Sequence, residues 1–184
     1  MSIEKYTTKA IVITWYDHGE HDRSYKMLTR DFGVIVAHAK SIRKLESKLR
    51  AHMSLTSEVM VTLVKGRELW RLVGAEEVSS RNSFFHEVIP LIGRFIQGEG
   101  THKTLYDKLI ELSDRGDTYD ATTKRLMMYF IILVSLGYAD ARVAGARDLK
   151  EYLSWSVDEM YPLVVLRYED IRQHVYMVLK EMQM

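Results

Sequence analysis

The sequence contains no cysteine and no long apolar run. Without cysteine, disulfides, thiolate metal sites, iron–sulfur clusters and cysteine nucleophiles are excluded. The longest uninterrupted apolar stretch, residues 126–134, is less than half of the roughly 20 residues that a membrane-spanning helix needs. The N-terminal residues also lack the apolar core of a signal peptide. We therefore expect a soluble, cytoplasmic and nucleoid-associated protein.

The composition is that of a globular protein, with 47% hydrophobic and 28% charged residues in a chain of 184. That length allows one large or two small domains. The net charge of +1 favours no class of partner, but its distribution is uneven. Residues 1–80 hold 13 Lys and Arg against 10 Asp and Glu, whereas residues 81–184 hold 13 against 15. An anionic partner is therefore expected at the N-terminal part.

Alternating apolar, Thr and aromatic residues predict short strands in the first 80 residues. The predicted strands cover residues 11–16, 24–29, 34–39, 59–65 and 69–73. Residues 40–55 lie between the third and fourth predicted strands, and the helical spacing of their apolar residues predicts a loop followed by a short helix. Five strands with a helix between the third and fourth are the layout of an oligonucleotide/oligosaccharide-binding (OB) barrel.

From about residue 83 the apolar residues recur with helical spacing. Helices are expected over residues 83–96, with Pro90 as a kink or late start, then over 101–112, 121–136 and 148–155, and as one closing amphipathic helix along 171–182. The helix over 121–136 is apolar nearly all round, so it should be the buried central helix, ended by Gly137. The prediction is an α+β chain, with an OB-fold nucleic-acid-binding domain over 1–80 and an α-helical domain over 81–184.

The densest charge is a basic run between the third and fourth strands. It consists of Lys40, Arg43, Lys44, Lys48 and Arg50, opposed only by Glu46. Lys and Arg at this density can neutralise several phosphates and release their counterions. An ordinary solvated surface is the alternative for such a run. Its position beside the open face of a barrel favours nucleic acid, and the patch could be extended by Arg23, Lys26, Arg67 and Arg71.

Single-strand binding also uses aromatic side chains on which bases stack. Alternation places Trp15 on the same strand face as Ile11 and Ile13, which favours core packing for Trp15. Tyr16 points the opposite way, and so does Trp70 relative to Leu69. Tyr16 and Trp70 are therefore the candidate stacking platforms.

Nothing in the sequence indicates catalysis. The segment 17–22 holds two His and three carboxylates, but it is typical of a turn, so a polar loop is favoured over a metal site. The nucleophile elbow, the zinc-protease HExxH motif and the dinucleotide fingerprint do not occur. We expect no catalytic residue, no metal and no cofactor, and a protein that is not an enzyme.

Several blocks of the sequence occur in the order of a known family. The blocks are KAIVITWYDHGEHDRSYKMLTRDFGVIVAHAKSIRK, then SKLRAHMSLTSEVMVTLVKGRELWRLVGAEE, and more thinly LYDKLIEL and LVSLGY. Together they resemble the bacterial DNA repair and recombination mediator family RecO. The resemblance implies an OB fold followed by helices. It also implies binding of single- and double-stranded DNA, annealing of complementary strands, and loading of the recombinase with a RecR-like partner onto DNA coated with single-stranded-DNA-binding protein. The matching basic residues are Lys40, Arg43, Lys44, Lys48, Arg50 and Arg67.

The sequence departs from the family pattern in three ways. Ser41 stands where the family usually has Gly, so the loop is expected to be stiffer or differently turned. The four-cysteine zinc module of some members is impossible here, and few residues follow Tyr138. Two alternatives stay open: a protein-interaction adaptor whose barrel has lost DNA binding, and an RNA-binding OB protein.

Overall fold

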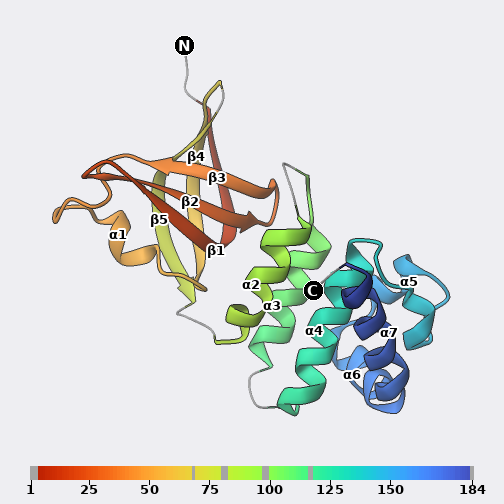
Figure 1. The fold of residues 1–184 in the computed structure, drawn as a ribbon. Helices are drawn as coiled ribbons and strands as arrows, with labels where there is room; N and C mark the ends of the chain where they lie inside the picture. Colours follow the sequence, from red (N-terminus) through yellow and green to blue (C-terminus); the bar gives the residue numbers. More distant parts are fainter. Residues whose placement is uncertain (1–3, 68, 80–82, 97–99, 116–117, 183–184) are drawn as a thin grey trace. The chain divides into compact units, whose positions relative to one another are not determined.

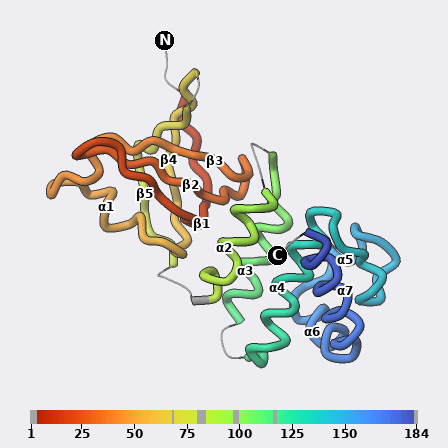
Figure 2. Tube along the Cα trace, in the orientation of Figure 1, coloured from red at the N-terminus to blue at the C-terminus, as the bar shows by residue number. Residues whose placement is uncertain are grey.

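The computed structural model describes residues 4–67, 69–79, 83–96, 100–115 and 118–182, in two compact units, Met1–Lys103 and Thr104–Met184 (Figures 1 and 2). The predicted boundary between residues 80 and 81 lies outside the described residues, so it stays a prediction.

The first unit contains a closed five-stranded barrel (Figure 1). Its strands are β1 (Lys5–His18), β2 (Asp22–Thr29), β3 (Gly33–Ala39), β4 (Glu58–Lys65) and β5 (Trp70–Ser79). They follow one another as β1-β2-β3-β5-β4, and only the β3–β5 pair is parallel. The one-turn helix α1 (Leu49–His52) lies between β3 and β4 in the chain and packs beside β5. The predicted OB barrel with its intervening helix is confirmed.

A β-bulge in β1 decides which side chains enter the barrel. The register of β1 against β2 shifts between Val12 and Thr14, so Ile13 is an extra residue without an opposite partner. Beyond the bulge, the strand presents its other face to the core. Trp15 consequently packs on the barrel core together with Val12, and not on the Ile11 and Ile13 face that simple alternation predicts. The predicted core role of Trp15 holds, but its predicted face is wrong.

Helix α2 (Ser83–Phe95) follows the barrel and contains Pro90 in its interior. Its buried positions are Phe85, Val88, Leu91 and Ile92, and the chain continues to a buried Ile96. Ile89, by contrast, is only partly buried.

The remaining helices are α3 (Lys103–Asp114), α4 (Ala121–Ser135), the 3-10 turn η1 (Ala141–Ala144), α5 (Leu149–Ser154), α6 (Val157–Leu166) and α7 (Tyr168–Glu181). Helix α4 is buried along most of its length, as predicted. It begins where Asp120 accepts a hydrogen bond from the amide of Thr123, and it ends at Gly137, which has a φ of 79°.

The C-terminal region differs from the single closing helix that the sequence predicts. A capping box between Ser156 and Glu159 starts α6, and α7 begins only after Arg167. Within the predicted closing helix, residues 171–182, Ile171 and Val175 are buried. None of the helices in the described ranges has the length and apolar character required to cross a bilayer.

Candidate nucleic-acid interface

The pairing of four strands produces two rows of side chains on opposite faces of the barrel wall. Residues directly opposite one another in paired strands share a face. The inner row is Trp15–Tyr25–Ala37–Trp70, and all four belong to the core or pack against it. The outer row lies one residue along each strand from the inner row and therefore points the opposite way. Its members, paired in this order, are Tyr16, Ser24, His38 and Arg71. The outer row crosses from β1 to β5 and combines an aromatic ring, an imidazole and a guanidinium.

Trp70 is not a stacking platform. Its side chain is 4% exposed and packs edge-on against Tyr6, with ring centroids 5.6 Å apart and Phe32 on another side at 5.1 Å. The prediction that Trp70 and Leu69 face opposite ways is right, but Leu69 is the outward one, at 59% exposed. The parallel pairing of Trp70 with Ala37 turns the indole into the barrel.

Tyr16, the other aromatic candidate, is 51% exposed in the outer row. His38 lies two positions further along the outer row, and the sequence did not identify it as a candidate. Its Nε2 lies 3.2 Å from Oδ2 of Asp22, and its Nδ1 lies 3.4 Å from the hydroxyl of Ser24. The signal that would have found His38 is its place between Ala37 and Ala39, two buried residues of one strand.

A surface hollow of about 420 Å³ lies over the β5 end of the outer row. Its lining residues are His38, Gly66, Arg67, Leu69 and Arg71. Two of the predicted cations, one from the β4–β5 connection and one from β5, are therefore brought beside the imidazole of β3. In OB folds, this connection and the neighbouring strands form the usual nucleic-acid face.

The basic run forms the loop between β3 and α1, followed by α1 itself. Lys40, Lys44, Lys48 and Arg50 are exposed. Arg43 is held against the β1–β2 hairpin, because its guanidinium donates to the carbonyl oxygen of Gly19 at 2.9 Å and its backbone amide donates to that of His21 at 3.0 Å. Four of the five predicted cations thus extend into solvent from a loop that is anchored by the fifth.

Asp22 is the second anchor of this loop. Its Oδ1 accepts the amide of Ser41 at 2.7 Å, and this hydrogen bond, with a further one from His38, holds the pKa of the Asp22 carboxyl below its ordinary value. Ser41 itself has a φ of 57°. It occupies the left-handed conformation that glycine adopts most easily, so the serine keeps a glycine-like turn.

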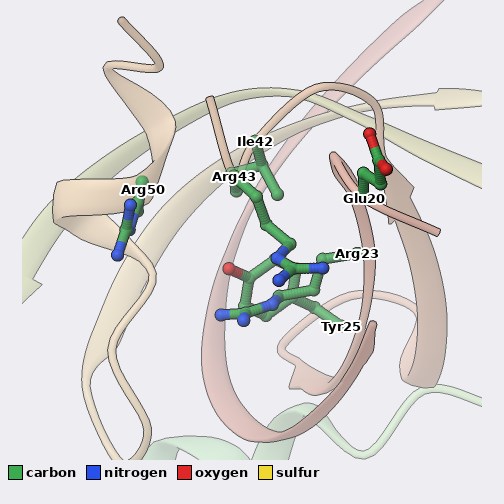
Figure 3. A pocket seen from close by; sticks show the side chains of 6 residues that line it. All are labelled: Glu20, Arg23, Tyr25, Ile42, Arg43 and Arg50. Carbon is green, nitrogen blue, oxygen red and sulfur yellow. The ribbon is translucent and has the colours of Figure 1, made fainter. Parts of the chain in front are cut away.

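At the end of the barrel where β1 turns into β2 lies a pocket of about 230 Å³ (Figure 3), here called the mouth pocket. It is lined by Glu20, Arg23, Tyr25, Ile42, Arg43 and Arg50. Arg23 donates to Oδ1 of Asp17 at 2.6 Å, which lowers the pKa of the Asp17 carboxyl. Its guanidinium carbon lies 4.6 Å from the centre of the Trp15 ring. Arg23 is therefore at the end of the inner row and not on the outer face.

Lys26, the remaining predicted cation, lies on β2 away from the mouth pocket. Its ammonium donates to the carbonyl oxygen of Gly93 in α2 at 3.2 Å. This side chain already has a partner within the first unit, and the structure does not bring it to the other cations.

Comparison with known proteins places this barrel in a family. Residues 1–81 match the family described as "Recombination protein O N terminal". A DNA repair protein RecO of Dehalococcoides mccartyi strain BAV1 is 31% identical over 144 residues, which cover 72% of this chain and 56% of the relative. RecO of strain CBDB1 is 37% identical over 75 residues, 41% of this chain and 30% of the relative. RecO of Heliobacterium modesticaldum is 33% identical over 84 residues, 46% of this chain and 31% of the relative. The chain thus spans between 30% and 56% of the length of these relatives.

Proposed function

The chain belongs to the RecO family through its N-terminal barrel, and we propose from this premise that it is a DNA-binding recombination mediator in DNA repair. In this proposal the barrel binds single-stranded and double-stranded DNA, and the protein anneals complementary strands. The observation that carries the proposal is the outer row from Tyr16 to Arg71, flanked at its β5 end by Arg67 and accompanied by the basic loop.

Each part of this surface has a physical role in the proposal. The exposed ring of Tyr16 offers a face to an unpaired base, and every base has such a face, so binding should tolerate any sequence. The cations Arg71, Arg67 and those of the basic loop neutralise phosphates and release counterions. Neutralising the phosphates of two strands also lowers the repulsion that opposes their pairing, which is how the same surface would promote annealing. No step in this mechanism is catalytic.

Docking of protein partners is proposed for the helical part, residues 81–184. The family resemblance implies a RecR-like mediator, the tail of single-stranded-DNA-binding protein and assistance to the recombinase, and we extend these to this chain as proposals. Supporting them, α6 and α7 expose apolar side chains, namely Val165, Leu166, Tyr176 and Met177. The protein would then act on DNA at the nucleoid.

The test is fluorescence anisotropy of a labelled single-stranded oligonucleotide across a salt series. The variant Lys40→Glu/Lys44→Glu reverses two exposed cations and leaves Arg43, which anchors the loop, in place. The matched control is Lys150→Glu/Lys180→Glu, which makes the same charge change at two exposed helical residues. The loop variant should bind at least about tenfold more weakly, with a salt slope reduced by about 1.4, since each single-strand contact contributes about 0.7. The control should bind as the wild type does.

Two results would redirect the proposal. Absence of binding by the wild type at low salt would overturn it and favour the protein-interaction adaptor. A preference for RNA over DNA of the same sequence in competition would favour an RNA-binding barrel, because the 2′-hydroxyl is the group that distinguishes the two. If DNA is bound, strand annealing by the same variants is the next measurement.

A further inference from the structure

The mouth pocket is lined by three arginines from three different parts of the barrel domain. Arg23 comes from β2, Arg43 from the loop after β3, and Arg50 from α1 (Figure 3). Glu20 is the one carboxylate that lines the pocket, and its side chain is 93% exposed, so it reaches into solvent. Asp17 pairs with two of these arginines, Arg23 and Arg43, so one carboxylate offsets part of the positive charge, and an anion that enters the pocket would offset more of it.

Two of the three guanidinium groups are held in place before any ligand arrives. Arg23 is fixed by its hydrogen bond to Asp17 and by its position over Trp15. Arg43 is fixed by its 2.9 Å hydrogen bond to the carbonyl oxygen of Gly19, with Asp17 Oδ2 3.8 Å from its Nε. A guanidinium carries five N–H donors, so each keeps donors for a ligand after these bonds are made. Binding therefore costs little side-chain ordering.

Two further side chains of the pocket, Arg50 and Tyr25, supply donors as well. No carboxylate lies within 4.0 Å of the Arg50 guanidinium in the part of the chain that the structure describes. Tyr25 is buried, and burial raises the pKa of its hydroxyl, which therefore keeps its proton at neutral pH and can donate it in a hydrogen bond.

We propose that the mouth pocket is a phosphate-binding site, in which Arg23, Arg43, Arg50 and the Tyr25 hydroxyl hold one phosphate group of a nucleic-acid strand. Three guanidinium forks and a hydroxyl offer more donors than the two oxygens of a carboxylate can accept, whereas a terminal phosphate presents three free oxygens and a phosphodiester presents two free and two ester oxygens. A volume of about 230 Å³ holds several waters at about 30 Å³ each, which is room for a phosphate with part of its hydration shell. The inference rests on the proposed function, because it names the chemical group of the strand that this end of the barrel takes.

The first experiment uses inorganic phosphate alone. In ¹⁵N-labelled full-length protein, the arginine Nε–Hε resonances are followed during titration with phosphate, and with chloride at the same ionic strength. Phosphate should shift the signals of Arg23 and Arg43 to saturation, whereas chloride should not. Arg50→Gln should weaken this binding about tenfold, which corresponds to one lost charge-assisted hydrogen bond. The matched control, Lys150→Gln, removes one charge from an exposed residue of α5 outside the pocket and should leave the binding of inorganic phosphate unchanged.

The second experiment distinguishes a strand end from an internal phosphate. Oligonucleotides of one sequence are compared with a 5′-phosphate, with a 3′-phosphate and with neither. Tighter binding of one phosphorylated form, lost in Arg50→Gln, would assign the pocket to that strand end. Equal binding of all three, weakened more by Arg50→Gln than by Lys44→Gln, would assign it to an internal phosphodiester. Both results support the site.

The proposal is overturned if phosphate produces no saturable shift, if Arg50→Gln weakens phosphate binding no more than Lys150→Gln does, or if Arg50→Gln weakens oligonucleotide binding no more than Lys44→Gln does. If oligonucleotides still bind in any of these cases, the proposed function stands, but this pocket is not part of it. Conversely, if phosphate binds saturably but no oligonucleotide binds, the proposed function is refuted. The phosphate that the pocket takes would then not belong to a nucleic-acid strand.

Discussion

The backbone amide of Ser41 donates a hydrogen bond to Oδ1 of Asp22, with 2.7 Å between nitrogen and oxygen. The other carboxylate oxygen of Asp22 lies 3.2 Å from Nε2 of His38 in the outer row. A single side chain at the start of β2 therefore connects the exposed face of the barrel with the turn that begins the basic loop. The stability of this connection, and the conformation of Ser41 within it, can be measured directly.

The contribution of Asp22 to stability should depend on pH. Its carboxyl pKa lies below its ordinary value of 3.8, first because of the Ser41 amide, so the native state binds the proton less tightly than the unfolded chain. The stabilisation is therefore complete above about pH 4 and lost as the pH falls below it. In urea unfolding, Asp22→Asn should be less stable than the wild type at pH 7, and the difference should shrink at pH 3. An equal difference at both pH values would contradict this assignment.

Replacing Ser41 by glycine should stabilise the protein. A non-glycine residue in the left-handed region costs about 1–2 kcal/mol, part of which glycine gives back through the entropy of the unfolded chain. The expected gain for Ser41→Gly is about 0.5–1 kcal/mol in the free energy of unfolding. Ser47→Gly is the control, since Ser47 lies in the same loop without a positive φ, and it should be neutral or destabilising. A gain in both variants would show that the backbone conformation is not the cause.

Alanine substitutions at two glycines should distinguish the cost of backbone strain from the cost of a steric clash. Gly19 and Gly33 both have positive φ, at 59° and 73°. A Cβ on Gly33 would lie 2.1 Å from the carbonyl oxygen of Gly100, whereas a Cβ on Gly19 would meet nothing within 4 Å. Gly19→Ala should cost about 1 kcal/mol of unfolding free energy for its φ alone, and Gly33→Ala about 3 kcal/mol or more. Equal losses in chemical denaturation would argue against the close approach at Gly33.

Tyr16 and Trp70 should respond in opposite ways to substitution. Tyr16→Ala removes an exposed ring, so it should weaken oligonucleotide binding by about five- to 150-fold, at about 1–3 kcal/mol per stacked base, with little effect on stability. Trp70→Phe shrinks a buried side chain, so it should lower the free energy of unfolding by about 1–3 kcal/mol and leave binding by the folded protein unchanged. Weaker binding by Trp70→Phe at full folding would restore Trp70 as a binding residue.

The sequence by itself determined the elements that depend on local pattern. Alternating β-branched and aromatic residues located all five strands, because a half-buried strand needs that period along its own length. The nearly continuous apolar surface of residues 121–135 located the buried helix α4, and Gly137 located its end. The density of Lys and Arg in residues 40–50 marked the basic loop, and the one-turn helix within it was also expected.

Only the tertiary structure decided which faces and charges come together. The extra residue Ile13 exchanges the faces of β1, and pairing with Ala37 turns Trp70 inward; both depend on register between strands that are distant in the sequence. The outer row and the three arginines of the mouth pocket exist because the sheet closes into a barrel and brings the β1–β2 hairpin beside the loop after β3. Periodicity reports how one strand alternates, but it carries no information on its partners, and these supply the rest of the interface.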